Sequence, residues 1–180
     1  SWSISPSLTF HLPADWEMTA RFTRAISDSG VKAEIFSGSS RLFVNDVRYK
    51  NDLWSAEFSS EGPLFALPGG EARVALGAGL RANGLDGSIY RTTSTATFAI
   101  QNYTDSQTAL FAYGEMFLPL IAGANALPLI HALQITGALR YERYDKMGSL
   151  ATPKLGIAYQ PIADLTLKAA WGKSFKAPTL

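Results

Sequence analysis

Strict alternation of apolar side chains with small or polar ones is the feature that most constrains how this chain folds. From Leu165 the sequence reads Leu-Thr-Leu-Lys-Ala-Ala-Trp-Gly-Lys-Ser, so Leu165, Leu167 and Trp171 share one parity, and Thr166 and Lys168 share the other. Successive side chains of a strand point to opposite faces of a sheet, whereas a helical period would bring Leu167 and Lys168 to one side. The segment therefore predicts a strand with one apolar and one polar face.

The same alternation recurs along most of the chain. It predicts two-faced strands at residues 8–12, 16–23, 53–59, 73–81, 110–118, 133–142, 154–160 and 165–174. Segments rich in proline, glycine or aspartate separate some of these strands, and longer polar segments separate others. The chain is therefore predicted to be all-β and antiparallel, with about eight strands.

The connections between these segments differ in length in a regular way. Proline fixes φ and aspartate caps a turn through its side chain, so both favour tight turns. Tight turns are expected at residues 13–15, 68–70 and 161–164, and longer polar loops at about 27–52, 83–107 and 145–150. Short turns at one end of a sheet and long loops at the other are typical of transmembrane barrels of the bacterial outer membrane.

One stretch, residues 116–133, resembles a membrane helix in length and apolar character, with only Asn125 and His131 as polar residues. It also contains Pro119 and Pro128, and each proline would remove a helical hydrogen bond and clash with the preceding turn. We therefore expect a connection between two strands, with a proline near each strand end, where a missing N–H does least harm.

The residues on the polar parity favour a membrane barrel over a soluble sheet, although a soluble antiparallel sheet packed on one face has the same period. They are mostly Thr, Gly, Ala, Ser and Gln, as in a water-filled barrel interior. Four large aromatic residues near strand ends on the apolar parity resemble the girdles of membrane barrels: Trp16, Tyr141, Tyr159 and Trp171. A soluble β-sandwich acting as a binding module remains the alternative.

Composition excludes several function classes. The net charge is +1 with no run of Lys or Arg, so we expect no nucleic-acid partner. The chain has no cysteine, which removes disulfides, thiol catalysis and zinc–cysteine or iron–sulfur sites. His11 and His131 lie alone, with no second ligand or nucleophile at a useful spacing, so we expect no metal, no cofactor and no enzyme activity. The first residues carry no signal peptide, which suggests a mature or excised segment.

The sequence Gly77-Ala78-Gly79-Leu80-Arg81-Ala82 matches the dinucleotide-binding pattern G-x-G-x-x-A. That pattern binds a pyrophosphate only where it follows a strand and opens a helix. Here the glycines lie within a predicted strand and Asn83-Gly84 follows them, so we expect no nucleotide site.

At the end of the chain, the predicted strand at residues 165–172 is followed by Phe175, Lys176, Ala177, Pro178, Thr179 and Leu180. This segment resembles the β-barrel of TonB-dependent outer-membrane receptors. In that family a strand of pattern Leu-x-Leu-Arg-Ala-Ser-aromatic-Gly precedes Phe-Arg-Ala-Pro-Ser-Leu. Lysine replaces arginine at position 176 and threonine replaces serine at 179, which keeps the charge and the hydroxyl. Residues 64–70 and 113–120 resemble family segments more loosely.

The resemblance implies that residues 1–180 are about eight strands of a larger 22-stranded transmembrane barrel, with the plug domain and the C-terminal strands absent. It implies active uptake of a scarce solute, such as a ferric siderophore, haem, cobalamin or an oligosaccharide, energised through TonB. The expected location is the bacterial outer membrane, and the expected partners are outer-membrane lipid, the plug domain, TonB and a small-molecule ligand. A self-contained eight-stranded outer-membrane barrel is the other alternative.

Parity assigns candidate residues to each face. Candidate lumen-facing residues, which would contact ligand or pair with the plug and neighbouring strands, are Arg73, Arg81, Gln134, Arg140, Glu142, Lys154 and Lys168. Candidate lipid-facing residues are Val74, Leu76, Leu80, Leu133, Ile135, Leu139, Leu155, Ile157, Leu165, Leu167 and Trp171. The basic bias of the first set favours an anionic ligand.

Overall fold

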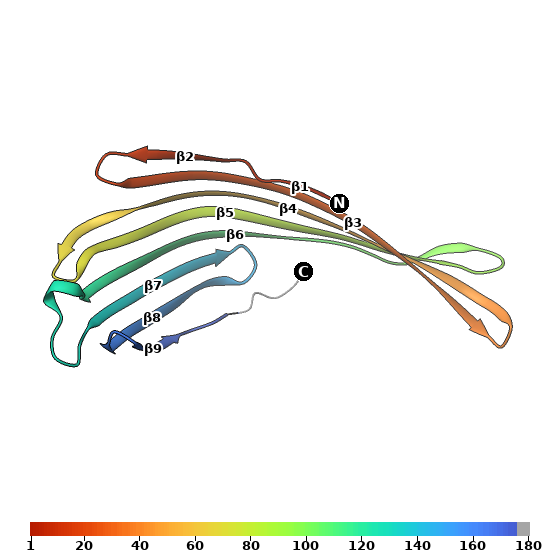
Figure 1. Ribbon diagram of the computed structural model, residues 1–180. Coiled ribbons are helices and arrows are strands. Elements are labelled where there is room, and N and C mark those ends of the chain that lie inside the picture. Colours follow the sequence, from red (N-terminus) through yellow and green to blue (C-terminus); the bar gives the residue numbers. More distant parts are fainter. Residues whose placement is uncertain (176–180) are drawn as a thin grey trace.

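The computed structural model describes residues 1–175 as one curved antiparallel sheet (Figure 1). Its strands run consecutively from β3 to β9, and both β1 and β2 pair with β3. The strands are β1 (Trp2–Ile4), β2 (Ser7–Leu12), β3 (Trp16–Ser37), β4 (Ser40–Leu67), β5 (Gly70–Thr92), β6 (Thr97–Ile121), β7 (Ala132–Tyr144), β8 (Gly148–Ile162) and β9 (Leu165–Gly172). A short 3-10 helix, η1 (Gly123–Asn125), follows β6.

Strands β1 and β2 together occupy one position of the sheet. β1 pairs with residues 24–26 of β3, and β2 pairs with residues 16–21 of the same strand. Pro6 lies between them and has no N–H to donate to a ladder, although its carbonyl accepts a hydrogen bond from the N–H of Phe22 at 3.1 Å. The nine strands therefore fill eight positions, which confirms the predicted all-β antiparallel fold of about eight strands.

The sheet is open. Within residues 1–175 the outer edge of β1 and β2 does not pair with β9, and no second sheet packs on either face. The described residues therefore form neither a closed small barrel nor a two-layer sandwich. An open run of consecutive antiparallel strands is what a segment of a larger barrel wall looks like.

The prediction of long polar loops at residues 27–52 and 83–107 is wrong. β3 and β4 stay paired out to Ser37↔Ser40, and β5 and β6 stay paired out to Thr92↔Thr97. Figure 1 shows these ribbons projecting well past the ends of β7–β9. Backbone pairing continues there, but the apolar parity now carries residues such as Asp28, which pairs with Lys50. Apolar residues such as Val31 and Val47 lie on the opposite parity there, so the two faces exchange character along the ribbon. The many polar residues of these segments, and not a loss of alternation, lead to the prediction of loops.

The tight turns lie at the opposite end, as predicted. β2 and β3 are joined by residues 13–15, and β4 and β5 by residues 68–69. Residues 116–133 form the end of β6, η1 and the start of β7, and the ladder skips a residue between Pro119 and Ile121. The described part of the chain contains no helix long and apolar enough to cross a membrane.

The two faces of the sheet differ in chemistry and in exposure. In most proteins the apolar face of a sheet is buried and the polar face exposed, and here the apolar face is the more exposed one. We call the face that carries Leu76, Leu139 and Leu167 the apolar face, and these leucines are 51%, 54% and 52% exposed. The opposite, polar face carries the buried residues Phe111 and Tyr144, each 5% exposed. Side chains crowd on the concave face of a curved sheet and spread on the convex face, so this sheet curves around its polar residues.

Exposed apolar surface on this scale requires a cover. Burying a leucine side chain is worth roughly 1.5–3 kcal/mol. The exposed large hydrophobic residues extend over β1 to β9, from Trp2 to Trp171. Such a surface far exceeds the scattered apolar residues of a soluble protein, so the apolar face is a contact surface.

The paired ribbons lead to a measurable difference in hydrogen exchange. Alternate amides within residues 28–36 and 98–107, those that face β4 and β5, should exchange about tenfold or more slowly than those of the connecting residues 94–95, because their N–H groups are held in ladders. Hydrogen exchange and mass spectrometry on the detergent-solubilised parent protein measure this. Equal, fast exchange throughout residues 83–107 would instead support the loop interpretation.

Candidate functional site

All seven candidate residues of the polar parity lie on the polar face. Arg73 and Arg81 come from β5, and the other five from β7 to β9 in sequence order: Gln134, Arg140, Glu142, Lys154 and Lys168. The structure brings Arg81, Arg140 and Glu142 into one cluster. Arg73 lies apart at the short-turn end, where it contacts Asp15 at 3.0 Å and Glu61 at 3.9 Å.

The cluster is built around the carboxylate of Glu142. Arg140 Nε donates to Glu142 Oε1 at 2.6 Å, and the hydroxyl of Tyr144 donates to Glu142 Oε2. A guanidinium nitrogen of Arg81 lies 3.7 Å from Glu142 Oε2. The three β7 residues alternate along one strand and so share a face. Arg81 reaches them across β6 where Ala109, paired with both Arg81 and Tyr144, takes up little space. With its side chain 12% exposed, Glu142 is a fixed anion held between two cations.

Aromatic residues of β6 support this cluster by lying across glycines of β5. A Cβ on Gly79 would come within 2.6 Å of Phe111 Cζ, and the guanidinium of Arg140 lies 5.0 Å from the centre of the Phe111 ring. A Cβ on Gly77 would come within 2.3 Å of Tyr113 Cζ. The glycines that match a dinucleotide-binding pattern are therefore strand positions over which rings lie.

Tyr113 uses that space to cross a whole strand. Its ring passes over Gly77 of β5, and its hydroxyl donates to Glu57 Oε1 of β4 at 2.7 Å. Glu57, Phe111, Tyr113 and Tyr144 were missed as site residues, because alternation alone shows only which face a residue occupies. The signal that identifies Phe111 and Tyr113 is a glycine on the polar parity of β5 opposite an aromatic residue of β6. No such signal marks Glu57.

Beside the cluster, the polar face of β7–β9 is hollowed. A depression of about 610 Å³ is lined by residues including Tyr113, Arg140, Thr152 and Lys154. A second of about 270 Å³ includes Lys168 and shares Thr136, Gly156 and Ala170 with the first, so the two are continuous. Within residues 1–175, neither Lys154 nor Lys168 makes an ion pair, so both present free cations to the hollow.

Two titratable groups farther out on the projecting ribbons are perturbed by their neighbours. The hydrogen bond from Lys146 holds the pKa of Asp105 below its usual range and ties the β7–β8 turn to β6. Loss of solvent around Tyr103, which faces Tyr49, raises the pKa of its hydroxyl. Tyr103 also lies across a glycine of β5, since a Cβ on Gly87 would come within 2.3 Å of its Cζ. The ribbons therefore carry ordered side-chain contacts as well as backbone pairing.

The eleven residues of the other predicted set all lie on the apolar face. Cross-strand pairing aligns them, as in the row Met116, Gly137, Leu155 and Trp171 from β6 to β9. Of the four motif residues at the end of the chain, Phe175 lies with its ring centre 6.4 Å from that of Tyr144. The other three, Lys176, Ala177 and Pro178, lie outside the described residues.

Comparison with known proteins gives a match over the whole chain. The family model described as TonB dependent receptor-like, beta-barrel matches residues 1–180. No curated protein and no solved structure matches the chain.

The ring-over-glycine contacts can be tested by substitution. Gly77→Ala should destabilise the parent protein by about 1–3 kcal/mol, because the new methyl group overlaps the Tyr113 ring and displaces its hydroxyl from Glu57. Urea unfolding in detergent micelles measures the change.

Gly84→Ala is the matched control on the same strand, since its Cβ would meet only Asp52 Cβ at 3.7 Å. It should change the unfolding free energy little. Equal loss at both positions would show that the cost comes from strand glycines in general and not from the ring of Tyr113.

Proposed function

The chain belongs to the family of TonB-dependent receptor-like β-barrels, and from this we propose that it is part of the barrel wall of an active importer. The family consists of transporters of the bacterial outer membrane. In the proposed importer, the barrel continues beyond these strands, a plug domain closes it, and TonB relays energy that opens the path. The imported solute is a scarce molecule too large to diffuse through a porin.

The observation that carries this proposal is the exposure of the apolar face. Leu76, Leu139 and Leu167 stand about half exposed on a sheet with no second layer among the described residues. Hydrocarbon covers such a surface at no cost in hydrogen bonding, because the backbone of the strands is already paired. The apolar face is thus the lipid-facing side, and the polar face lines the interior.

The charges of the polar face favour an anionic solute. Arg81 and Arg140 are neutralised by Glu142, so they stiffen the wall and offer little net charge. Among residues 1–175, Lys154 and Lys168 make no ion pair within 4.0 Å, and Glu115 lines the same hollow as Lys154. Of the solutes considered, a ferric siderophore with free carboxylates or a haem with its propionates fits these lysines better than a neutral oligosaccharide does.

A second role for the same lysines is contact with the plug domain. A barrel interior filled by a plug presents its charges to that plug as well as to solute. The two roles differ in outcome, because loss of a plug contact lowers the stability of the receptor, whereas loss of a solute contact lowers affinity at unchanged stability.

Neutralising both lysines tests the solute role. Lys154→Gln combined with Lys168→Gln in the parent receptor should weaken binding of an anionic solute by about a hundredfold or more, since each of the two ionised hydrogen bonds contributes roughly 1.5–3 kcal/mol. Binding is measured by fluorescence quenching on purified receptor at low and high salt.

Lys32→Gln combined with Arg41→Gln is the control, because both residues are exposed on the projecting ribbon and the pair removes the same two positive charges. A double variant that binds the solute normally but unfolds at lower temperature would assign the two lysines to the plug.

Two adjacent residues of β9 test which face of the sheet meets lipid and which meets water. Leu167→Arg should cost roughly 2–4 kcal/mol of barrel stability where the residue lies near the bilayer midplane, while Thr166→Arg should be tolerated because its side chain meets water. Refolding into lipid vesicles, followed by the mobility of unheated samples on gels, gives the folded fraction. Equal damage from both variants would contradict the assignment of the two faces.

A further inference from the structure

The connection between β6 and β7 differs from the other connections at the short-turn end of the sheet. Residues 122–131 contain no aspartate, glutamate, lysine or arginine, whereas the tight turns after β2 and β8 each contain an aspartate, Asp15 and Asp164. Leu127 and Leu129 of this connection are 55% and 72% exposed. The connection therefore presents apolar surface at a place where two neighbouring turns present charge.

Leu129 is held in a conformation that a leucine rarely adopts. Residues 127–130 form a two-residue turn, closed by hydrogen bonds from the N–H of Leu127 to Ile130 O at 3.0 Å and from the N–H of Ile130 to Leu127 O at 2.9 Å. Pro128 and Leu129 occupy its central positions, and φ of Leu129 is +62°. Glycine or asparagine is usual where φ is positive at the second central position, because a Cβ is strained there. An exposed leucine at this position is costly unless its side chain gains contacts that water does not provide.

The turn is tied to the apolar face of the sheet. The hydroxyl of Tyr159 donates to Leu129 O at 2.5 Å. Tyr159 lies on the apolar face, because it pairs with Leu167 of β9. Ile162 and Leu165, which pair with each other at the same end of the sheet, add further exposed apolar side chains to this face. The turn therefore adjoins the apolar face, and its two leucines extend the apolar surface past the ends of the strands.

Hydrogen bonds hold both ends of the connection. At the β6 end, the side chain of Asn125 accepts from the N–H of Ala122 at 2.7 Å and donates to Leu120 O at 3.0 Å. At the β7 end, the N–H of His131 donates to Gln160 O at 2.7 Å. These bonds fix where the turn lies relative to β6 and β8, so the position of its leucines is built into the fold.

We propose that residues 127–130, which we call the apolar turn, insert among the acyl chains of the phospholipid leaflet that faces the periplasm. The short turns of an outer-membrane barrel lie on the periplasmic side. The ring and hydroxyl of Tyr159 suit the boundary between acyl chains and headgroups. Lipid covers Leu127 and Leu129 without disturbing the backbone, because the hydrogen bonds of Leu127 and Ile130 close the turn on itself. The proposal rests on the proposed placement of the chain in the outer membrane.

Spin labelling of the full-length parent receptor in phospholipid vesicles tests the proposal. Residues 1–180 contain no cysteine, and any cysteine elsewhere in the parent is first replaced by serine. A nitroxide attached through Leu129→Cys should lie about 5–10 Å inside the boundary between headgroups and acyl chains. Its relative accessibility to oxygen and to a water-soluble nickel chelate measures this depth.

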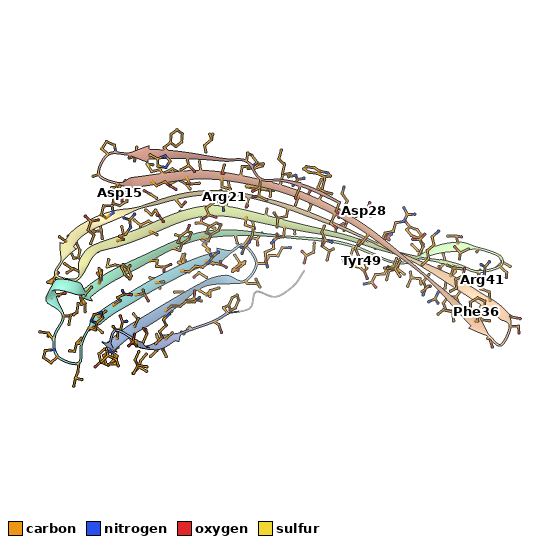
Figure 2. All side chains as sticks on the ribbon, viewed as in Figure 1. Asp15, Arg21, Asp28, Phe36, Arg41 and Tyr49 are labelled. Atoms are coloured by element: carbon orange, nitrogen blue, oxygen red, sulfur yellow. The ribbon has the colours of Figure 1, made fainter. Side chains whose placement is uncertain are left out.

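Ala14→Cys is the matched control for this label. Ala14 also has a positive φ, of +61°, and it lies beside Asp15 in a tight turn at the same end of the sheet (Figure 2). The label at position 14 should be accessible to the nickel chelate. A label at position 129 that is equally accessible to the chelate would overturn the proposal and leave a periplasmic protein as the partner of the turn.

An aspartate at the tip of the turn gives a second result, whose sign depends on the surroundings. Aspartate adopts a positive φ more readily than leucine, so Leu129→Asp should stabilise a turn that lies in water. Among acyl chains the same charge should destabilise the receptor. We therefore expect the midpoint of urea unfolding from vesicles to fall for Leu129→Asp and to stay unchanged for Ala14→Asp. An unchanged or higher midpoint for Leu129→Asp would overturn the proposal, and the spin labels decide the question if this variant fails to fold.

A third label separates failure of this proposal from failure of the proposed function. A nitroxide attached through Leu167→Cys, on the apolar face of β9, should be accessible to oxygen and shielded from the nickel chelate. A label at position 167 in hydrocarbon with a label at position 129 in water contradicts the apolar turn alone. If both labels lie in water, the assignment of the apolar face to lipid is contradicted, and the importer wall with it.

Discussion

Backbone hydrogen bonding between neighbouring antiparallel strands is the interaction on which this structure depends. The described residues contain few buried hydrophobic side chains, among them Ala72, Ala109 and Phe111, and these do not form a core in the usual sense. Long ladders take its place, since β3, β4, β5 and β6 pair over nearly their whole lengths. In hydrocarbon an unpaired N–H or C=O is costly, so a complete ladder holds a single-layer sheet together where it would fail in water.

The side chains of the polar face then give this wall its shape. Rings of β6 lie over glycines of β5, which draws adjacent strands together on that face and crowds residues such as Tyr113 and Phe111. The same arrangement aligns Glu142 with its two arginines, while Lys154 of β8 and Lys168 of β9 make no ion pair with any residue from 1 to 175. Rigid, neutralised charge and accessible charge thus lie side by side on the polar face.

Alternation in the sequence was enough to predict the fold class and the face of the sheet that each described candidate residue occupies, and proline and aspartate were enough to predict the tight turns. It succeeded because, inside the apolar band, the environment differs on the two sides of each strand, as at Leu167 and Lys168. It failed for the projecting ribbons because they are rich in polar residues such as Asp28 and Lys50, and because their apolar residues, such as Val31, fall on the opposite parity from those of the inner strands. It also missed the contacts of Tyr113 and Glu57, which depend on the register between strands and not on either strand alone.

The bulges of the projecting ribbons affect how residues can be added to or removed from these ribbons. One lies between Ile35 and Phe36 of β3 and another between Ile89 and Tyr90 of β5, both far from the apolar band. Adding two residues to a ribbon preserves the side to which each inner position points, whereas adding one reverses it unless a bulge absorbs the difference. Placing these irregularities near the tips lets the outer reach of the molecule lengthen or shorten while the membrane portion keeps its register.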